Sequence, residues 1–250
     1  MALSNNTFCW NGLISSDPAK TLAFFPEVLG WQRQTIEMDG ETVEMLANDN
    51  EPLAHVRGPA AAGEPSWWNN YFRVDDVDAV AKKAAAAGGK ILVEPTDIGP
   101  GRFATIATPS GASLSLFHER NPEDKDAEVK AGNIHWVDLH SKDIEADLGF
   151  IRDGLGLKTN EMPMPNGPYH ILEPDSATRA GAMTGQNPNA PSMWLAWVQV
   201  EDVDGALDRV GRHGGQVLAP AWDAEGIGRM VIASDPVGVV FGLIRPPAAN

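Results

Sequence analysis

The feature that most constrains the fold of this chain is an internal repeat. Residues 72–92 read FRVDDVDAVAKKAAAAGGKIL, and residues 198–218 read VQVEDVDGALDRVGRHGGQVL. The match extends through most of the chain, and matching positions such as Trp10 and Trp136 lie 126 residues apart. Self-similarity over such a distance indicates that the 250 residues contain two copies of one folding unit.

The two copies occupy residues 6–118 and 132–246, and we expect each to form a domain of the commonest size. The segment between them, 119–131, reads ERNPEDKDAEVKA. It is rich in charge and nearly free of large apolar side chains, which indicates a solvated linker.

Both copies show the same order of secondary-structure signals. A strand-like segment, TFCWNGLIS or NIHWVDLHS, is followed by a helix-capping aspartate, Asp17 or Asp143. Helical apolar spacing then ends at Gly30 or Gly156. A hairpin region, a further strand, a second helix closed by Gly-Gly and three short strands complete each copy.

This order predicts an α+β fold. Each copy should contain two βαβββ modules, whose eight strands form a curved, partly closed mixed sheet with the helices outside. The face of the sheet away from the helices, called the inner face below, is then free to hold a ligand. We expect either a monomer whose domains are related by a pseudo-twofold axis or a homodimer.

Charge and composition exclude several classes of partner. The formal net charge is −15, which repels phosphate backbones and anionic membrane surfaces, so we expect neither nucleic acid nor membrane as a partner. No stretch reaches the roughly 18 apolar residues of a membrane helix, and the opening MALSNNTFCW does not look like a secretory signal. Cys9 is the single cysteine, which fits a reducing cytoplasm.

Taken in order, these elements resemble the vicinal oxygen chelate superfamily, the group of glyoxalases, bleomycin-resistance proteins and extradiol dioxygenases. The resemblance is carried by FCWNGLISSDPAKTLAFFPEVLGW, YFRVDDVDAV and GPGRFATIATPSGASLSLF and by their counterparts in the second copy. It covers nearly the whole chain and is strongest to the tandem two-domain branch called hydroxylase-like or glyoxalase-like. It implies the fold but leaves the function open among lyases, isomerases, dioxygenases, transferases and antibiotic-sequestering binders.

The resemblance also implies where a metal would be held. Enzymes of the family use His or Gln on the first strand, His on the strand before the second helix and Glu on the last strand. In this chain those positions fall on Trp10, Asn69 and Ser115 in the first copy, and on Trp136, Leu195 and Gly242 in the second. Indole, leucine and glycine side chains offer no metal donor, and Asn and Ser are poor substitutes. We therefore predict no metal site and no other cofactor.

The densest polar cluster is the H-x-x-D-x-H stretch of His135, Asp138 and His140. Strand alternation places Asp138 and His140 on the same face as Trp136, and His135 on the opposite face. One interpretation is a solvated strand end or a structural His–Asp pair. The other makes His140 and Asp138 the catalytic candidates, as a proton-transfer pair for a ligand that rests on Trp136.

The ligand-binding candidates are the aromatic and polar residues expected on the inner faces. They are Trp136, Trp197 and Gln199 in the second copy, and Trp10, Asn69, Tyr71 and Arg73 in the first. Such a lining suits a planar small molecule, although the same aromatic rings could simply fill the interior. The second copy combines two indoles with a carboxylate and an imidazole, so we expect it to bind the ligand. Its affinity should then change between about pH 5.5 and 7.5.

Three further residues have alternative interpretations. Arg102 and Arg229, in the motifs GPGR and GIGR, could hold a ligand carboxylate or could be ordinary arginines at strand edges. His55 stands alone in the first hairpin region, where Gly181 is its counterpart, and is expected to be an ordinary strand residue.

Two functional hypotheses follow. The first is a protein that binds a small organic molecule in a cleft without the family's metal. The second is an enzyme of glyoxalase, isomerase or dioxygenase type that acts on a small carbonyl or aromatic substrate, by proton transfer rather than through a metal.

Overall fold

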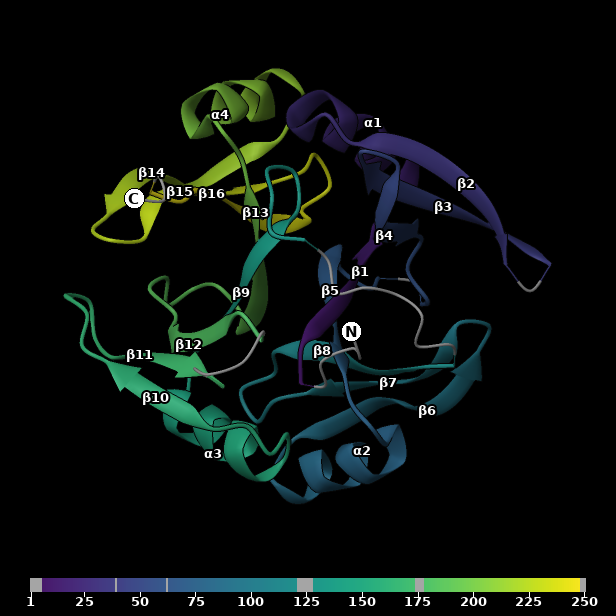
Figure 1. Cartoon of the computed structure of the whole chain (residues 1–250), viewed down its shortest axis with the longest axis vertical. Coiled ribbons are helices and arrows are strands. Elements are labelled where there is room, and N and C mark those ends of the chain that lie inside the picture. Colours follow the sequence, from purple (N-terminus) through teal and green to yellow (C-terminus); the bar gives the residue numbers. More distant parts are fainter. Residues whose placement is uncertain (1–5, 39, 62, 121–127, 174–177, 248–250) are drawn as a thin grey trace. The chain divides into compact units, whose positions relative to one another are not determined.

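The computed structural model describes residues 6–38, 40–61, 63–120, 128–173 and 178–247 (Figure 1). Residues 121–127, most of the predicted linker, lie outside this set. In the described parts of the chain each repeat contributes eight strands and two helices, and each set of strands forms one sheet. No helix among them is long and apolar enough to cross a membrane.

The elements of the two repeats correspond one to one. The first repeat contains β1 (Phe8–Ile14), α1 (Pro18–Leu29), β2 (Gln32–Met38), β3 (Glu41–Asn48), β4 (Glu51–Arg57), β5 (Trp67–Arg73), α2 (Val77–Ala86), β6 (Lys90–Ile98), β7 (Gly101–Ala107) and β8 (Ser113–Glu119). The second contains β9 (Ile134–Ser141), α3 (Ile144–Asp153), β10 (Thr159–Met162), β11 (Tyr169–Leu172), β12 (Ala180–Thr184), β13 (Met193–Gln199), α4 (Val203–Arg212), β14 (Gln216–Ala224), β15 (Gly228–Ser234) and β16 (Val240–Arg245).

Both sheets are mixed and share one strand order. The first is β2-β3-β4-β1-β5-β8-β7-β6, and the second is β10-β11-β12-β9-β13-β16-β15-β14. In each module the first strand pairs with the last in parallel, as β1 does with β4 and β13 with β16, while the remaining pairs within the module are antiparallel. These sheets confirm the predicted α+β fold with two βαβββ modules in each repeat.

The first helix of each repeat starts at its predicted capping aspartate, and the same capping contact recurs in all four helices. Asp17, Asp76, Asp143 and Asp202 each accept a hydrogen bond from the backbone N–H three residues ahead. Gly30 closes α1 in the left-handed conformation, with φ of 75°, as expected. The expected end of α3 was wrong: Gly154 is its cap residue, and Gly156, with φ of 74°, lies in the turn that follows.

Residue contacts divide the chain into two compact units that cut across the repeats. One, the α2–α3 unit, comprises Met1–Trp10, Asn70–Asp126 and Trp136–Leu195. The other, the α1–α4 unit, comprises Asn11–Asn69, Ala127–His135 and Ala196–Asn250. Each unit therefore joins one module of the first repeat to one module of the second. Figure 1 shows the result as two helix pairs, α1 beside α4 and α2 beside α3.

An aromatic cluster fills the core of the α1–α4 unit. Phe25 on α1 stacks on Trp31 with ring centroids 5.2 Å apart, and it also meets Phe241 of β16 at 5.3 Å. The buried Trp31 indole donates a hydrogen bond to the backbone oxygen of Gly132, at 2.7 Å. Apolar burial across the two modules, one from each repeat, thus provides the main stabilisation of this unit.

A buried carboxylate joins the two modules of the α2–α3 unit. Asp147 on α3 is fully buried and accepts hydrogen bonds from the backbone N–H of Ser110, at 3.0 Å, and from the Ser110 hydroxyl. The hydroxyl of Ser141 donates to the same carboxylate at 2.6 Å. Because Ser110 lies in the β7–β8 turn of the first repeat, this contact links a turn of one repeat to a helix of the other.

The α1–α4 unit makes the equivalent contact, but here the carboxylate belongs to the turn and the hydroxyl to the helix. Asp235, in the β15–β16 turn, accepts a hydrogen bond from the hydroxyl of Thr21 on α1 at 2.6 Å, and from the backbone N–H groups of Val237 and Val239. Thr21 is the counterpart of Asp147 in the repeat. Both units therefore contain the same helix-to-turn contact. The acid is on the helix in the α2–α3 unit, as Asp147, and in the turn in the α1–α4 unit, as Asp235.

We predict that Asp147→Ala lowers the free energy of unfolding by about 3 kcal/mol, because Ser110 and Ser141 lose their acceptor inside the protein. Urea denaturation followed by circular dichroism measures the change. Asp153→Ala, at the exposed end of the same helix, is the matched control and should change stability by less than about 0.5 kcal/mol. Equal losses in the two variants would show that the buried contact contributes nothing.

Candidate functional site

Strand β9 carries the predicted polar cluster on its inner face. Val137 and Leu139 are buried on the helix side of the strand. Alternation directs Trp136, Asp138 and His140 to the inner face, as the sequence predicts. These residues and the strands β10 to β12 beside them belong to the α2–α3 unit.

Tyr169 completes this cluster, and sequence reasoning missed it. Its hydroxyl donates a hydrogen bond to Oδ1 of Asp138, at 2.6 Å. The Trp136 indole N–H is shared between the same carboxylate oxygen, at 2.9 Å, and the Tyr169 oxygen, at 2.6 Å. Asp138 is only 5% exposed, so a buried carboxylate is held by two neutral aromatic donors.

A glycine makes room for this arrangement. Gly181 on β12 pairs with Asp138 on β9, and a Cβ atom at Gly181 would lie 1.9 Å from the Tyr169 hydroxyl oxygen. In the first repeat the corresponding cross-strand pair is Gly12 and His55. Glycine and polar residue have therefore changed places between the repeats. The first repeat has His55 where the second has Gly181, and Gly12 where the second has Asp138.

The protonation states of the cluster follow from its burial. Burial, together with the charge of Asp138, raises the pKa of Tyr169, so its phenol stays protonated. Burial also lowers the pKa of His140, and the opposing effect of Asp138 is smaller. His140 is thus a neutral imidazole near pH 7, and Nε2 is buried and has no hydrogen-bond partner. Burial moves the titration of His140 to lower pH, while the change of ligand affinity between about pH 5.5 and 7.5 stays a prediction.

Three candidates from the first repeat lie in the same α2–α3 unit. Trp10 is half-buried on β1. The buried Tyr71 ring meets Phe117 edge-on at 6.0 Å. The buried Arg73 has Nε 2.8 Å from Glu119, which the structure therefore makes its ion-pair partner. No ligand contact tests the predicted binding roles of these residues.

The remaining candidates lie in the α1–α4 unit. Asn69 is buried on β5. Trp197 is 2% exposed and meets the half-exposed Trp222 edge-on at 6.1 Å. The side-chain oxygen of Gln199 accepts a hydrogen bond from Nδ1 of His135, at 3.1 Å. Gln199 therefore contacts His135, the histidine that the sequence predicts on the face of β9 opposite to Trp136.

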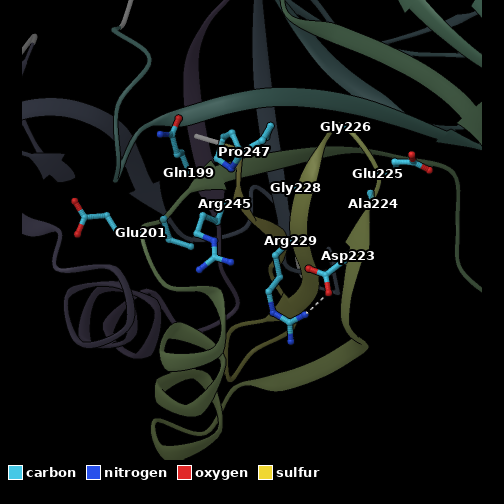
Figure 2. Close-up of a pocket in the computed structure, with 12 residues that line it drawn as sticks. Gln199, Glu201, Asp223, Ala224, Glu225, Gly226, Gly228, Arg229, Arg245 and Pro247 are labelled. Atoms are coloured by element: carbon cyan, nitrogen blue, oxygen red, sulfur yellow. Dashed lines mark hydrogen bonds and ion pairs between the residues drawn. The ribbon is translucent and has the colours of Figure 1, made fainter. Parts of the chain in front are cut away.

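Gln199 also lines a hollow of about 980 Å³ in this unit (Figure 2). The lining includes Glu201, the β14–β15 hairpin and the prolines after β16. Figure 2 shows the guanidinium of Arg229 directed to Asp223, at 3.0 Å. Three carboxylates and two arginines line the hollow, and no cluster of aromatic side chains lies among its lining residues.

Both candidate arginines bind carboxylates of the protein itself. Arg229 is 2.7 Å from Asp204 at the start of α4 and also pairs with Asp223. Arg102 makes the same double contact in the other unit, with Asp78 at the start of α2, at 2.6 Å, and with Asp97. Each arginine thus fixes the start of a helix to an edge strand. The interpretation as a grip for a ligand carboxylate has no support.

The residues at the metal-ligand positions of the second repeat do not fit a metal. Trp136 offers only an N–H donor, which its two hydrogen bonds already use. Gly242 pairs with Trp197, and a Cβ atom there would lie 2.2 Å from the indole. A metal-binding glutamate cannot stand at position 242 while Trp197 holds its place.

The first repeat offers no better set. Trp10 and Asn69 occupy the first-strand and middle-strand ligand positions. Ser115 occupies the last-strand position, and its hydroxyl is hydrogen-bonded to that of Thr105, at 2.9 Å. Among the residues that the structure describes, no three His, Cys, Asp or Glu side chains are grouped so that they could hold a metal ion together. The donor chemistry of neither repeat therefore fits the divalent metal implied by the resemblance.

The two mixed sheets with tandem βαβββ modules define a vicinal oxygen chelate protein of the two-domain type. The chain belongs to the Glyoxalase/Bleomycin resistance protein/Dioxygenase superfamily, whose family model matches residues 8–129 and 133–243. The predicted resemblance is confirmed.

Particular relatives are similar over nearly the whole chain. "Putative glyoxylase CFP32" of Mycobacterium tuberculosis is 29% identical over 244 residues, covering 95% of this chain and 94% of that protein. "Anthracycline biosynthesis protein DauV" of Streptomyces sp. (strain C5) is 30% identical over 256 residues, covering 94% of this chain and 92% of that protein.

Solved structures share the fold at low sequence identity. The 2,2',3-trihydroxybiphenyl 1,2-dioxygenase of Sphingomonas wittichii strain RW1 superposes with a TM-score of 0.66 at 13% identity, over 97% of this chain and 91% of that one. The Mn(II)-bound glyoxalase of Novosphingobium aromaticivorans gives a TM-score of 0.63 at 19% identity, over 98% and 83%.

We predict that Gly181→Ala displaces Tyr169 and lowers the free energy of unfolding by about 1–3 kcal/mol, because the new methyl group overlaps the phenol. The Trp136 indole N–H resonance should shift in ¹H–¹⁵N spectra. In a Tyr169→Leu background the same substitution should cost less. Gly149→Ala on α3, where a Cβ atom meets nothing within 4 Å, is the control and should not destabilise. Equal costs of Gly181→Ala in both backgrounds would contradict the overlap.

A second prediction concerns His55, whose pKa is lowered by burial to about 4. A histidine with a depressed folded-state pKa adds stability above its unfolded pKa and loses it as the pH falls through the folded value. Unfolding free energy should therefore drop by up to about 3 kcal/mol between about pH 6.5 and 4, and His55→Gln should remove much of that slope. The control His213→Gln, at an exposed position, should keep it. An unchanged slope in His55→Gln would refute the assignment.

Proposed function

We propose that the protein binds a small organic molecule on the inner face of β9 to β12, and that it does so without the metal of its family. The observation that carries this proposal is the replacement of the metal ligands by an organised polar cluster. The positions of the ligands hold Trp136, Leu195 and Gly242, and the Trp136 indole is hydrogen-bonded to Asp138 and Tyr169. An aromatic wall with a few fixed polar groups is the usual lining of a small-molecule site.

The names of the relatives support a small-molecule role without defining the ligand. One relative is named for a glyoxylase and another for anthracycline biosynthesis, although both are similar to this chain over more than nine-tenths of its length. Two such different names on one scaffold agree with the rule that function resides in the site rather than in the fold. We also place the protein in the cytoplasm, because a single cysteine fits a reducing compartment.

A second candidate function rests on His140. A neutral imidazole with a free Nε2 can accept a proton from a bound substrate, and such a base contributes on the order of 10²–10⁴-fold to a rate. Turnover of a catechol or of the methylglyoxal–glutathione hemithioacetal that is lost in His140→Ala would favour an enzyme. Equal turnover in the variant would remove His140 from any mechanism.

The binding proposal predicts that an organic molecule co-purifies with the protein under gentle conditions and is visible by native mass spectrometry. Its affinity, measured again on stripped protein by calorimetry, should fall at least about tenfold in Trp136→Ala, because one wall of the site is lost. Trp10→Ala alters the equivalent residue of the first repeat and is the matched control, with little expected effect.

Two results would contradict this proposal. A transition metal bound at one equivalent or more in untagged protein would mean that the site is metal-dependent after all. A larger loss of affinity in Trp10→Ala than in Trp136→Ala would mean that the ligand binds in the first repeat.

A further inference from the structure

One polar atom of the cluster on the inner face of β9, Nε2 of His140, is buried without a hydrogen-bond partner. Asp138, Tyr169 and Trp136 satisfy one another, whereas Nε2 of His140 is buried and makes no hydrogen bond. A buried polar atom without a partner costs on the order of 1–3 kcal/mol, so native structures rarely keep one without a reason. A bound molecule that supplies the missing hydrogen bond is such a reason.

The surroundings of this atom restrict the chemistry of that molecule. Burial raises the pKa of Tyr169, and the carboxylate charge of Asp138 adds to this effect. The same charge opposes the burial that lowers the pKa of His140, so the field of Asp138 reaches both side chains. His140 itself carries no compensating charge near pH 7, because burial lowers its pKa. An anionic group at Nε2 would therefore meet a negative charge and a neutral ring.

Met183 is an apolar neighbour of both His140 and Tyr169. On β12 it pairs with His140 on one side and with Tyr169 on the other. Its side chain is half-buried, and methionine adapts its shape to the ligand that covers it. A polar anchor thus stands next to an adaptable apolar surface.

We infer that the neutral His140 carries its proton on Nδ1, that the ligand of this site is an aromatic or similarly apolar molecule carrying a hydroxyl or protonated amine, and that this group donates a hydrogen bond to Nε2 of His140. Carboxylates and other anions are selected against by Asp138. This inference rests on the proposed function and specifies the class of ligand. His140 and Asp138 act here as specificity-determining residues.

Three probes that share one ring test the inference: benzyl alcohol, benzylammonium and benzoate. Each is titrated at pH 7.5 into the intact, ligand-stripped protein, and ¹H–¹⁵N spectra follow the Trp136 indole and the His140 ring. The alcohol and the ammonium should bind about tenfold or more tightly than benzoate. His140→Phe, which keeps a ring but no nitrogen, should weaken both donor probes and leave benzoate unchanged.

Asp138→Asn separates charge from shape. It keeps a side-chain oxygen for Trp136 and Tyr169, but it should reduce the disadvantage of benzoate to within about threefold of the alcohol. If benzoate binds wild-type protein as well as the donor probes do, the inferred ligand class is overturned while binding at this face stands. If the probes perturb only the Trp10 or Trp197 signals, or none, the proposed site itself is wrong and the inference falls with it.

Discussion

The structure depends on the way in which a βαβββ module buries its helix. One module has a single helix and a four-stranded part of a sheet. The apolar surface of this helix is fully buried only when a second module packs against it. In this chain the partner module always comes from the other repeat. The helix-to-turn contacts of Asp147 and of Asp235 lie at these junctions, and each carboxylate accepts hydrogen bonds both from the opposite module and from its own. Duplication therefore built two units whose cores are shared between the copies.

This arrangement explains why the copies agree in some residues and differ in others. The capping aspartates and the glycines that end the helices must be kept in both copies, because each unit uses one module of each. Inner-face residues are under no such constraint. The exchange of Gly12 and His55 for Asp138 and Gly181 shows the consequence. Each repeat pairs one glycine with one polar residue, but the acid lies in only one of them.

Sequence reasoning reached the fold because its signals are local. The N-caps at Asp17 and Asp143, the Gly-Gly helix ends and strand alternation each depend on a few adjacent residues, and they appear in the structure as expected. Alternation also predicted the shared face of Trp136, Asp138 and His140. Tyr169 could not be predicted in this way. Its contact with Asp138 depends on the pairing of β11 with β12 and on an absent Cβ at Gly181, which is visible only once the strands are in register.

The same non-local cause explains the arginines, whose partners lie on other elements. Arg73 faces Glu119, 46 residues away, and Arg102 faces Asp78, 24 residues away. From sequence alone each was available to a ligand, but in the structure each is bound by a carboxylate of the protein. Both arginines lie on strands of the first repeat, and the inner face of β9 to β12 carries the acid Asp138, the neutral imidazole of His140 and the aromatic rings of Trp136 and Tyr169. Under the proposed function, this family scaffold presents a surface suited to hydrogen-bond donors in place of its metal site.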